Sequence, residues 1–544
     1  MERALTDVPP EKGLLPRALR RPWLLVVLAA PALFVAYLLI SRQLGVNADG
    51  ASNAIQAREM LHGNLLLRGW TVTDVSFYTN ELLLFMLVEL VYGFHHDTTH
   101  ATAALVLTLV VLVVAAAAKG RATGREAAGR IAVAVAIVAV PALGHAATTL
   151  LTSPDHTGTA IPLLATWLVL EWARPGRGLP LLIAAMLAWA QIADPLVMYI
   201  GVLPLVVVGC WRAARERSWR GLDARLALAG AGSVVLAQGA LMLLRAAGGF
   251  GAHAAEAKLA ELSNMGWQIW LCVRVVAVNY GAYAPDRHGP ADTLMSGVHL
   301  VGLLAAAAAL VVVVARALLR RSGEPGDRLA ELVAVGIVVN LGAFVISALP
   351  VDLYSARQVV AVLPLGAVLA GRVWGPRLAR LPRATPVAVV VFVLLGAELV
   401  GHAAAKGEPG HAADVARWLD GRGLRYGLGD YWNSNNITVL TDGRVAVRPV
   451  VTSDPISAYR WESKVDWYDP AEYDATFLVL DTRNPSRGEA TATAQWGPPV
   501  ERHEFAGTVV LVYDKDLLVG LPAYCMPEHA PSIAQCPTHG PALF

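Results

Sequence analysis

Charged residues are scarce in this chain of 544 residues. Asp, Glu, Lys and Arg together make up 16% of the sequence, whereas 56% is hydrophobic, and a soluble chain of this size would be far more polar. The formal net charge is only +2, and there is no polybasic tail with interleaved aromatic residues, so we expect no nucleic-acid partner. The composition predicts a polytopic α-helical membrane protein that is surrounded by membrane lipids.

Cysteine is also rare, with four residues in the whole chain. Cys210 and Cys272 lie in apolar or amphipathic surroundings and are expected to be buried hydrophobic residues rather than reactive thiols. Cys525 and Cys536 lie at short spacing near the end of a polar tail. In an exported tail such a pair predicts a disulfide that closes a small loop; two unpaired thiols are the alternative.

Long apolar runs alternate with short polar breaks over the first 403 residues. A helix needs about 20 apolar residues to cross a bilayer, and basic loops mark the cytoplasmic side. The basic segments are residues 17–21, 119–130, 174–177, 212–225, 316–328 and 372–383. Alternating them with the breaks predicts about 11 transmembrane helices, at residues 22–40, 98–118, 130–151, 158–173, 179–193, 195–211, 226–246, 293–314, 328–349, 358–372 and 384–402.

We expect an integral, multi-pass protein of the plasma membrane. The odd number of spans predicts a cytoplasmic N-terminus and an extracytoplasmic C-terminus. The longest break, residues 247–292, is expected to be an outer loop. For residues 22–40 a cleaved signal peptide is the alternative. The run is long for a signal peptide, and Asn47-Ala48-Asp49 is a poor cleavage site, so we expect this span to be retained.

The first outer loop, residues 41–97, contains two further apolar stretches at 50–62 and 77–93. No basic segment separates 77–93 from the next span. If this stretch crossed the membrane, the basic loop 119–130 would lie outside, against the positive-inside bias. We therefore expect both stretches to be helices that lie along or dip into the outer surface.

The composition changes after about residue 403, so we predict a transmembrane domain at 1–403 and a small extracytoplasmic α/β domain at 404–544. In the second domain apolar runs shrink, and Asp, Tyr, Trp, Asn and Pro become more frequent. A helix is expected at 414–419. Short β-branched runs bounded by turn residues predict strands at 437–440, 445–450, 476–480 and 508–513.

Four of the predicted outer breaks carry ionisable groups beside helix ends. Charges near a membrane are costly unless they face a wet cavity or a partner, so several on one face indicate a shared polar site. Solvated loop residues are the alternative for each of them. The groups are Asp49, Asp155 with His156, Asp194, and Asp352 with Arg357.

The loop after the first span has an acidic residue, a helix-forming stretch and a Gly-Trp pair. Its residues are Asn47-Ala48-Asp49-Gly50, Ala54, Ala57, Leu61, Gly63 and Gly69-Trp70. The segment resembles the first extracytoplasmic loop of the GT-C superfamily, membrane glycosyltransferases that use polyprenyl-phosphate-linked sugars. In that superfamily a tyrosine-containing second helix follows, similar to Tyr78 to Gly93 here.

Two later segments agree with the resemblance. The first is Ser355-Ala356-Arg357-Gln358 with Val362-Leu363-Pro364, which is similar to an Arg-Tyr…Pro segment that begins a late span in the superfamily; Gln358 replaces the usual tyrosine. The second, Tyr426 to Trp432 followed by Ile437 to Leu440, resembles the outer C-terminal domain of bacterial members. The aromatic-rich oligosaccharyltransferase motif is missing, and Gly50 stands where many members have a second acidic residue.

The resemblance implies an inverting transfer of a sugar from a polyprenyl-phosphate donor to an acceptor on the outer face. The acceptor would be an envelope glycan, lipid or protein. Such a step needs a carboxylate base and a cation for the departing phosphate. Asp49 fits the catalytic base. Arg357 fits the phosphate site, since a guanidinium makes bidentate contacts with phosphate oxygens.

Further side chains are candidates for binding substrate. Asp155 and His156 are expected to bind the acceptor or a divalent metal ion, although one adjacent acid and histidine are a weak metal pattern. Tyr78 and Glu81 belong to the second helix of the loop. Arg58 and Arg68 are candidates for binding an anionic lipid, with a solvated helix face as the alternative. Aromatic residues of the outer domain fit stacking on a sugar, with core packing as the alternative; they are Tyr431, Trp432, Trp461, Trp467 and Tyr468.

Two other functions stay open at this point. A transporter or lipid flippase would call for internal repeats, broken helices near mid-membrane and acidic residues inside spans. The other hypothesis is a non-catalytic assembly protein of the cell envelope, with the outer domain as its binding module.

Overall fold

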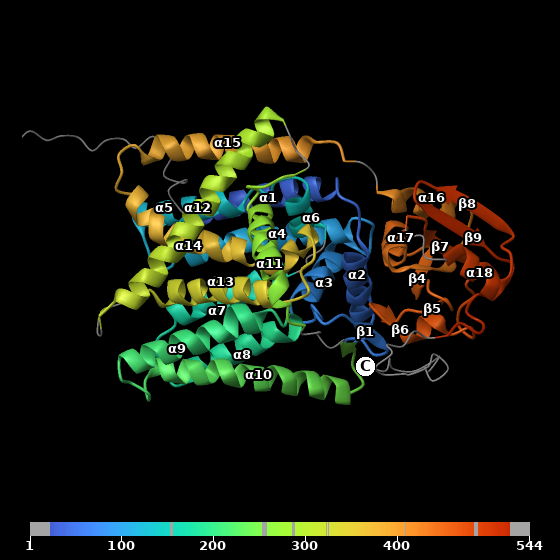
Figure 1. The fold of residues 1–544 in the computed structure, drawn as a ribbon, viewed down its shortest axis with the longest axis horizontal. Coiled ribbons are helices and arrows are strands. Elements are labelled where there is room, and N and C mark those ends of the chain that lie inside the picture. Colours follow the sequence, from blue (N-terminus) through green and yellow to red (C-terminus); the bar gives the residue numbers. More distant parts are fainter. Residues whose placement is uncertain are drawn as a thin grey trace, which may run out of the picture.

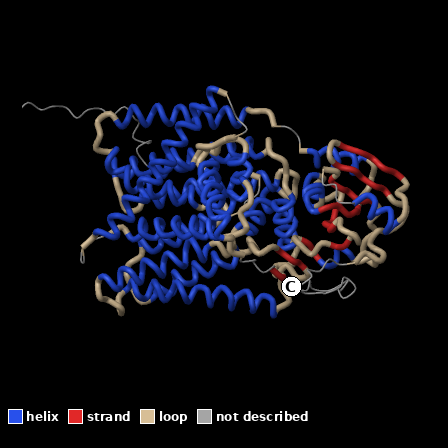
Figure 2. The backbone as a smooth tube through the Cα atoms, in the orientation of Figure 1, coloured by secondary structure: helices blue, strands red, loops and turns tan. Residues whose placement is uncertain are grey.

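The computed structural model describes residues 22–522, apart from 153–155, 253–257, 286–288, 322–323, 325, 408–409 and 484–487. Long helices fill one end of the molecule, and a β-sheet with its own helices lies at the other end (Figures 1 and 2). The predicted disulfide of Cys525 and Cys536 lies outside the described residues, as does Asp155. Cys272 is buried as expected, whereas Cys210 is exposed.

The helical end consists of helices that differ in length from 5 to 30 residues. They are α1 (Pro22–Ser41), α4 (Thr98–Lys119), α5 (Gly124–Val138), α6 (His145–Leu151), α7 (Ala160–Trp172), α8 (Gly178–Ala193), η2 (Met198–Val202) continued by α9 (Leu203–Arg215), α10 (Leu222–Ala246), α11 (Met265–Asn279), α12 (Pro290–Leu319), α13 (Arg328–Ile346), η4 (Leu353–Val359), α14 (Val362–Leu378) and α15 (Ala384–Ala404). Among the described residues six helices are long and apolar enough to cross a membrane, or seven if η4 and α14 form one bent span. The chain is a multi-pass membrane protein.

One expectation about the helices was wrong. The single span expected at 130–151 is two helices, α5 and α6, because Pro141 lacks a backbone donor and Gly144 has a φ of +87°, which ends the helical path. The segment expected to be an outer loop, residues 247–292, contains a helix, α11. The 15 residues of α11 mix Trp, Gln and Arg with apolar residues.

The first loop forms α2 (Ala48–Leu61) and α3 (Glu81–Tyr92), close to the two helices expected there. Asn47 caps α2 by accepting a hydrogen bond from Gly50 N at 2.8 Å. In Figure 1, α2 runs across the direction of the long helices, between them and the sheet. Ten of its 14 residues are buried, since α3 packs on one side and α17 (Asn435–Leu440) on another. Helix α2 is therefore enclosed by protein on several sides.

The sheet at the other end has six strands in the order β5-β4-β3-β7-β9-β8. β3, β4 and β7 are parallel, and the remaining pairs are antiparallel. Helices α16 (His411–Gly421), α17 and α18 (Gly488–Trp496) accompany it. The strands are β3 (Tyr426–Asp430), β4 (Ala446–Val451), β5 (Ser457–Ala458), β7 (Phe477–Asp481), β8 (Glu501–Phe505) and β9 (Thr508–Val512).

Three of the four expected strands correspond to β4, β7 and β9, but the strand expected at 437–440 was wrong because these residues belong to α17. The Thr438 hydroxyl accepts a hydrogen bond from Val447 N at 3.0 Å, and the helix packs against α2. Tertiary packing thus overrides the β-propensity of this short run.

A second, three-stranded sheet joins distant parts of the chain. β1 (Trp70–Val72) of the first loop pairs with β2 (Gly251–Ala252) in parallel and with β6 (Ser463–Lys464) in antiparallel orientation. Residues 46–85 of the first loop and residues 428–521 also contribute to one apolar core. The first loop is therefore held in a fixed position against the C-terminal region.

Five of the six predicted basic segments, all except residues 17–21, which lie outside the described residues, come together at one end of the helices. They line a cavity of about 600 Å³, which we call the basic cavity. Its charged lining residues are Arg121, Glu126, Arg130, Glu171, Asp327, Arg328 and Arg372. The meeting of these segments fits the alternation of loops on which the sequence-based topology rests.

Candidate functional site

A second cavity, of about 390 Å³, lies where the first loop, the helices and the C-terminal region meet; we call it the polar cavity. It is lined by Asp49, Thr73, Asp74, Val75 and Phe77 of the first loop, by His156, by Arg357 and Gln358, and by Tyr431, Trp432, Tyr459, Trp461 and Glu462 of the C-terminal region. Three ionisable residues singled out in the sequence, Asp49, His156 and Arg357, therefore share one cavity with three of the candidate stacking residues, Tyr431, Trp432 and Trp461.

Asp49 lies in the first turn of α2, where the orphan N–H groups and the helix dipole favour a carboxylate. The Tyr431 hydroxyl donates a hydrogen bond to Asp49 Oδ1. Tyr431 belongs to η5 (Tyr431–Asn433), which directly follows β3. A carboxylate of the first loop is thus oriented by a phenol from the C-terminal region.

Arg357 lies in η4, just before the helix axis bends by 55° into α14. The backbone on both sides of it is fixed by side chains of neighbouring helices. Asn279 of α11 donates to Ala356 O at 2.9 Å, and Asn340 of α13 donates to Gln358 O at 3.1 Å. Two buried amides therefore hold the segment that carries the guanidinium to the cavity.

His156 has a φ of +46°, in the left-handed region that non-glycine residues seldom adopt. Its Nδ1 lies 2.8 Å from Asp194 Oδ2. Burial would raise the pKa of Asp194, but His156, the Thr159 hydroxyl and Leu196 N together hold that pKa below its usual range. The ionised carboxylate fixes the imidazole with Nδ1 as the protonated nitrogen, so the lone pair of the neutral ring is on Nε2.

Glu81 lies behind His156 and does not line the polar cavity. It is fully buried at the start of α3, and a Cβ atom at Gly158 would overlap its carboxylate. Burial, and then the charge of Asp194, raise the pKa of Glu81 to about 8. The side chain is therefore protonated near neutral pH. It packs behind the residues that line the polar cavity and supports them.

Two other expected substrate-binding residues lie away from the polar cavity. The Tyr78 hydroxyl donates to Leu65 O at 2.7 Å, and its ring packs on Phe250. The Arg58 guanidinium lies 4.5 Å from the centre of the Phe94 ring. The metal site expected at Asp155 and His156 stays a prediction, because Asp155 is outside the described residues.

The C-terminal region supplies an aromatic wall to the polar cavity. The Tyr431 ring packs edge to face against Trp432 and against Tyr459, with 5.0 and 5.9 Å between the ring centres. The Trp461 ring lies parallel to that of Tyr459, with 6.3 Å between the centres. Trp432 is 58% exposed, so its indole is not committed to core packing. By contrast, Trp467 and Tyr468 are buried in the core, as the alternative interpretation of these aromatic residues expected.

Glu462 and Tyr459 were not recognised in the sequence. Glu462 is 2% exposed, Gln56 donates a hydrogen bond to its Oε2, and Thr73 N donates to its Oε1 at 3.2 Å. It reaches the cavity because β6 pairs with β1, a contact between segments almost 400 residues apart for which a single sequence carries no local signal.

The fold matches that of known membrane enzymes. The structure of ArnT from Cupriavidus metallidurans bound to undecaprenyl phosphate superposes with a TM-score of 0.51 at 17% identity, covering 90% of this chain and 97% of ArnT. The apo structure of ArnT gives a TM-score of 0.50 at 15% identity, with the same coverage. The chain has the GT-C fold.

No protein-family model matches the sequence, and no curated protein matches it. At 17% identity the GT-C likeness establishes the fold. The chemistry has to be derived from the residues of the polar cavity.

Proposed function

We propose that this protein is a membrane glycosyltransferase that transfers a sugar from a polyprenyl-phosphate donor to a hydroxyl group of a cell-envelope acceptor. The observation that carries the proposal is that Asp49 and Arg357, from segments about 300 residues apart, line one cavity. ArnT, which shares the fold, has been solved with undecaprenyl phosphate bound. A lipid phosphate fits a cavity that has a guanidinium on its wall.

In the proposed reaction the acceptor oxygen attacks the anomeric carbon of the donor sugar. Asp49 takes the proton of the attacking hydroxyl while the new C–O bond forms. The bond between the anomeric carbon and the phosphate oxygen breaks, and the phosphate leaves with the electron pair. Arg357 stabilises the charge that develops on the phosphate, so the products are the glycosylated acceptor and the polyprenyl phosphate.

The aromatic wall supports a sugar as the group bound next to Asp49. Flat apolar rings stack on the apolar faces of pyranose or furanose rings, and Trp432 and Trp461 line the cavity on the same side as Tyr431. His156 and Glu462 add hydrogen-bonding groups at the cavity wall. We propose that these side chains orient the acceptor, whereas Arg357 holds the donor phosphate.

We propose that the reaction takes place on the outer face of the plasma membrane, with the C-terminal region outside the cell. The separation of the two cavities supports this location. Arg357 precedes α14 and lines the polar cavity, while Arg372 lies near the other end of α14 and lines the basic cavity. The straight part of this path, from Val362 to Arg372 in α14, rises about 15 Å, or about half the thickness of the hydrocarbon core.

The test is a turnover assay with the purified full-length protein and a panel of radiolabelled undecaprenyl-phosphate sugars, measuring release of undecaprenyl phosphate and transfer of label. Asp49→Asn should lower turnover about a hundredfold or more with donor binding nearly unchanged, because the amide cannot take a proton. Asp414→Asn, which removes an exposed carboxylate of α16, is the matched control. Movement of intact labelled lipid across vesicles without cleavage would instead support a transporter.

A further inference from the structure

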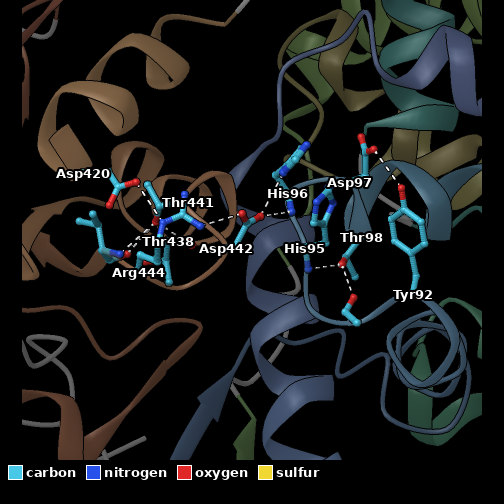
Figure 3. Close-up of polar contacts among 12 residues, drawn as sticks. Tyr92, His95, His96, Asp97, Thr98, Asp420, Thr438, Thr441, Asp442 and Arg444 are labelled. Carbon is cyan, nitrogen blue, oxygen red and sulfur yellow. Dashed lines mark hydrogen bonds and ion pairs between the residues drawn. The ribbon is translucent and has the colours of Figure 1, made fainter.

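A separate cluster of metal-ligating side chains lies at the turn between α3 and α4, away from the polar cavity (Figure 3). One ligand atom each from His95, His96 and Asp97 lies within 4.8 Å of the other two. We propose that these three residues bind a divalent transition-metal ion, with zinc as the metal that their donor atoms suit best. The site is independent of the proposed glycosyl transfer.

The donor set selects the class of metal. Two imidazole nitrogens and one carboxylate oxygen are a common three-ligand set for zinc, with water in the fourth position. Magnesium and calcium prefer oxygen ligands throughout. Zinc bonds of about 2.0–2.1 Å place tetrahedral ligands roughly 3.4 Å apart, so donor atoms that lie within 4.8 Å of one another are already near that spacing.

His96 is held for coordination by a carboxylate behind it. Asp442 Oδ1 accepts hydrogen bonds from His96 N at 2.8 Å and from His96 Nδ1 at 3.0 Å, and Figure 3 shows both contacts. Because the carboxylate accepts from Nδ1, the lone pair of the neutral ring is on Nε2. Metal-binding histidines usually donate their other ring nitrogen to such a carboxylate, which fixes the tautomer and makes the ligand more basic.

His95 and Asp97 are also fixed in place. The ring of His95 lies 3.8 Å from that of His96, centre to centre, and meets the edge of the Tyr92 ring at 5.4 Å. The Arg42 guanidinium donates to both carboxylate oxygens of Asp97, at 3.1 and 2.5 Å. A carboxylate has about four lone-pair sites, so Asp97 can bind a metal ion while it keeps the contact with Arg42.

The place of the cluster suggests what the metal would do. The α3–α4 turn belongs to the helical end of the molecule, whereas Asp442 follows α17 in the C-terminal region. Arg444 links Asp442 to Asp420, at 2.9 and 3.0 Å. A metal ion bound to His96 strengthens the hydrogen bond between His96 and Asp442. The metal ion therefore stabilises the contact between the C-terminal region and the helical end, which together form the polar cavity.

The test is zinc binding by the full-length protein, purified without a polyhistidine tag and stripped with a chelator. Zinc chloride is titrated against a fluorescent zinc indicator. We expect the wild type to bind one more equivalent of zinc than the His95→Ala/His96→Ala double variant. We also expect zinc to raise the thermal midpoint of the wild type by several degrees and to leave that of the double variant unchanged.

Two further variants test the details. Asp442→Asn should keep the binding capacity but weaken the affinity about 10- to 100-fold, as the loss of an orienting carboxylate does at metal sites. His62→Ala removes an exposed histidine outside the cluster and should bind as the wild type does. If the double variant fails to fold, His96→Gln changes a single half-exposed side chain and should still lose affinity. Equal zinc binding by the wild type and the His96 variants would refute the site.

Discussion

The basic cavity and the polar cavity contain the same types of charged side chain, but these side chains have different partners. In the basic cavity Arg372, whose side chain is 3% exposed, bonds to Asp327 at 2.8 Å and to Glu171. In the polar cavity, Asp49 accepts a hydrogen bond from the Tyr431 hydroxyl, and His156 Nδ1 lies 2.8 Å from the buried Asp194. Arg372 and its carboxylates brace neighbouring helices, whereas Asp49 and Arg357 line a cavity that is large enough for a small ligand.

The largest difference should be in which side of the membrane each cavity faces. In a background in which the native cysteines are replaced by alanine, Ala471→Cys tests the C-terminal region and Ser218→Cys tests the basic end; both positions are exposed. An impermeant maleimide applied to intact cells should label Ala471→Cys fully and Ser218→Cys only after lysis. Labelling of Ser218→Cys in intact cells would reverse the proposed topology.

Replacing one arginine in each cavity distinguishes a residue that stabilises the fold from one that binds the donor. Arg372→Ala leaves Glu171 and Asp327 without the cation between them. We expect a loss of about 2–3 kcal/mol, below the 3–5 kcal/mol of a fully buried pair because Asp327 is 41% exposed. The measurement is the thermal midpoint in a fixed detergent.

Arg357→Lys is the matched change in the polar cavity. It keeps the charge but loses the planar fork, so it should weaken donor binding about tenfold and leave the thermal midpoint within error. A large fall of the midpoint in Arg357→Lys, with donor binding intact, would show that both arginines are structural.

The sequence predicted the parts of the site that lie at helix ends. Asp49, His156 and Arg357 each follow or precede an apolar run, so a topology argument could bring them to one face. Glu462 and Tyr459 come from a region without periodicity and reach the cavity through the pairing of β6 with β1. Such a contact depends on the whole fold, as does the helical state of residues 437–440, where burial against α2 outweighs local propensity.

Glu81 offers a pH-dependent test of the wall behind His156. Its pKa is near 4.5 in the unfolded chain and about 8 in the fold, so the folded state holds a proton that the unfolded state has released. Stability should therefore fall as pH rises from about 5 to 8 and level off above that range. Glu81→Gln, which cannot ionise, should remove this decline and be more stable than the wild type at pH 9. A decline that persists unchanged in Glu81→Gln would assign it to another group.

The smallest effect, and the one that bears most directly on the polar cavity, is expected from Tyr431→Phe. This change removes the hydroxyl that donates to Asp49 but keeps the ring that meets Trp432 and Tyr459. A hydrogen bond to a carboxylate stabilises its charged form by roughly 1.5 kcal/mol. The acidic limb of the pH–rate profile should therefore move up by about one pH unit, with a fewfold change of rate at neutral pH. Tyr473→Phe removes a phenol hydroxyl outside the cavity and should leave the profile in place. A Tyr431→Phe profile identical to that of the wild type would mean that the acceptor has already displaced Tyr431 from Asp49 before the step that limits the rate.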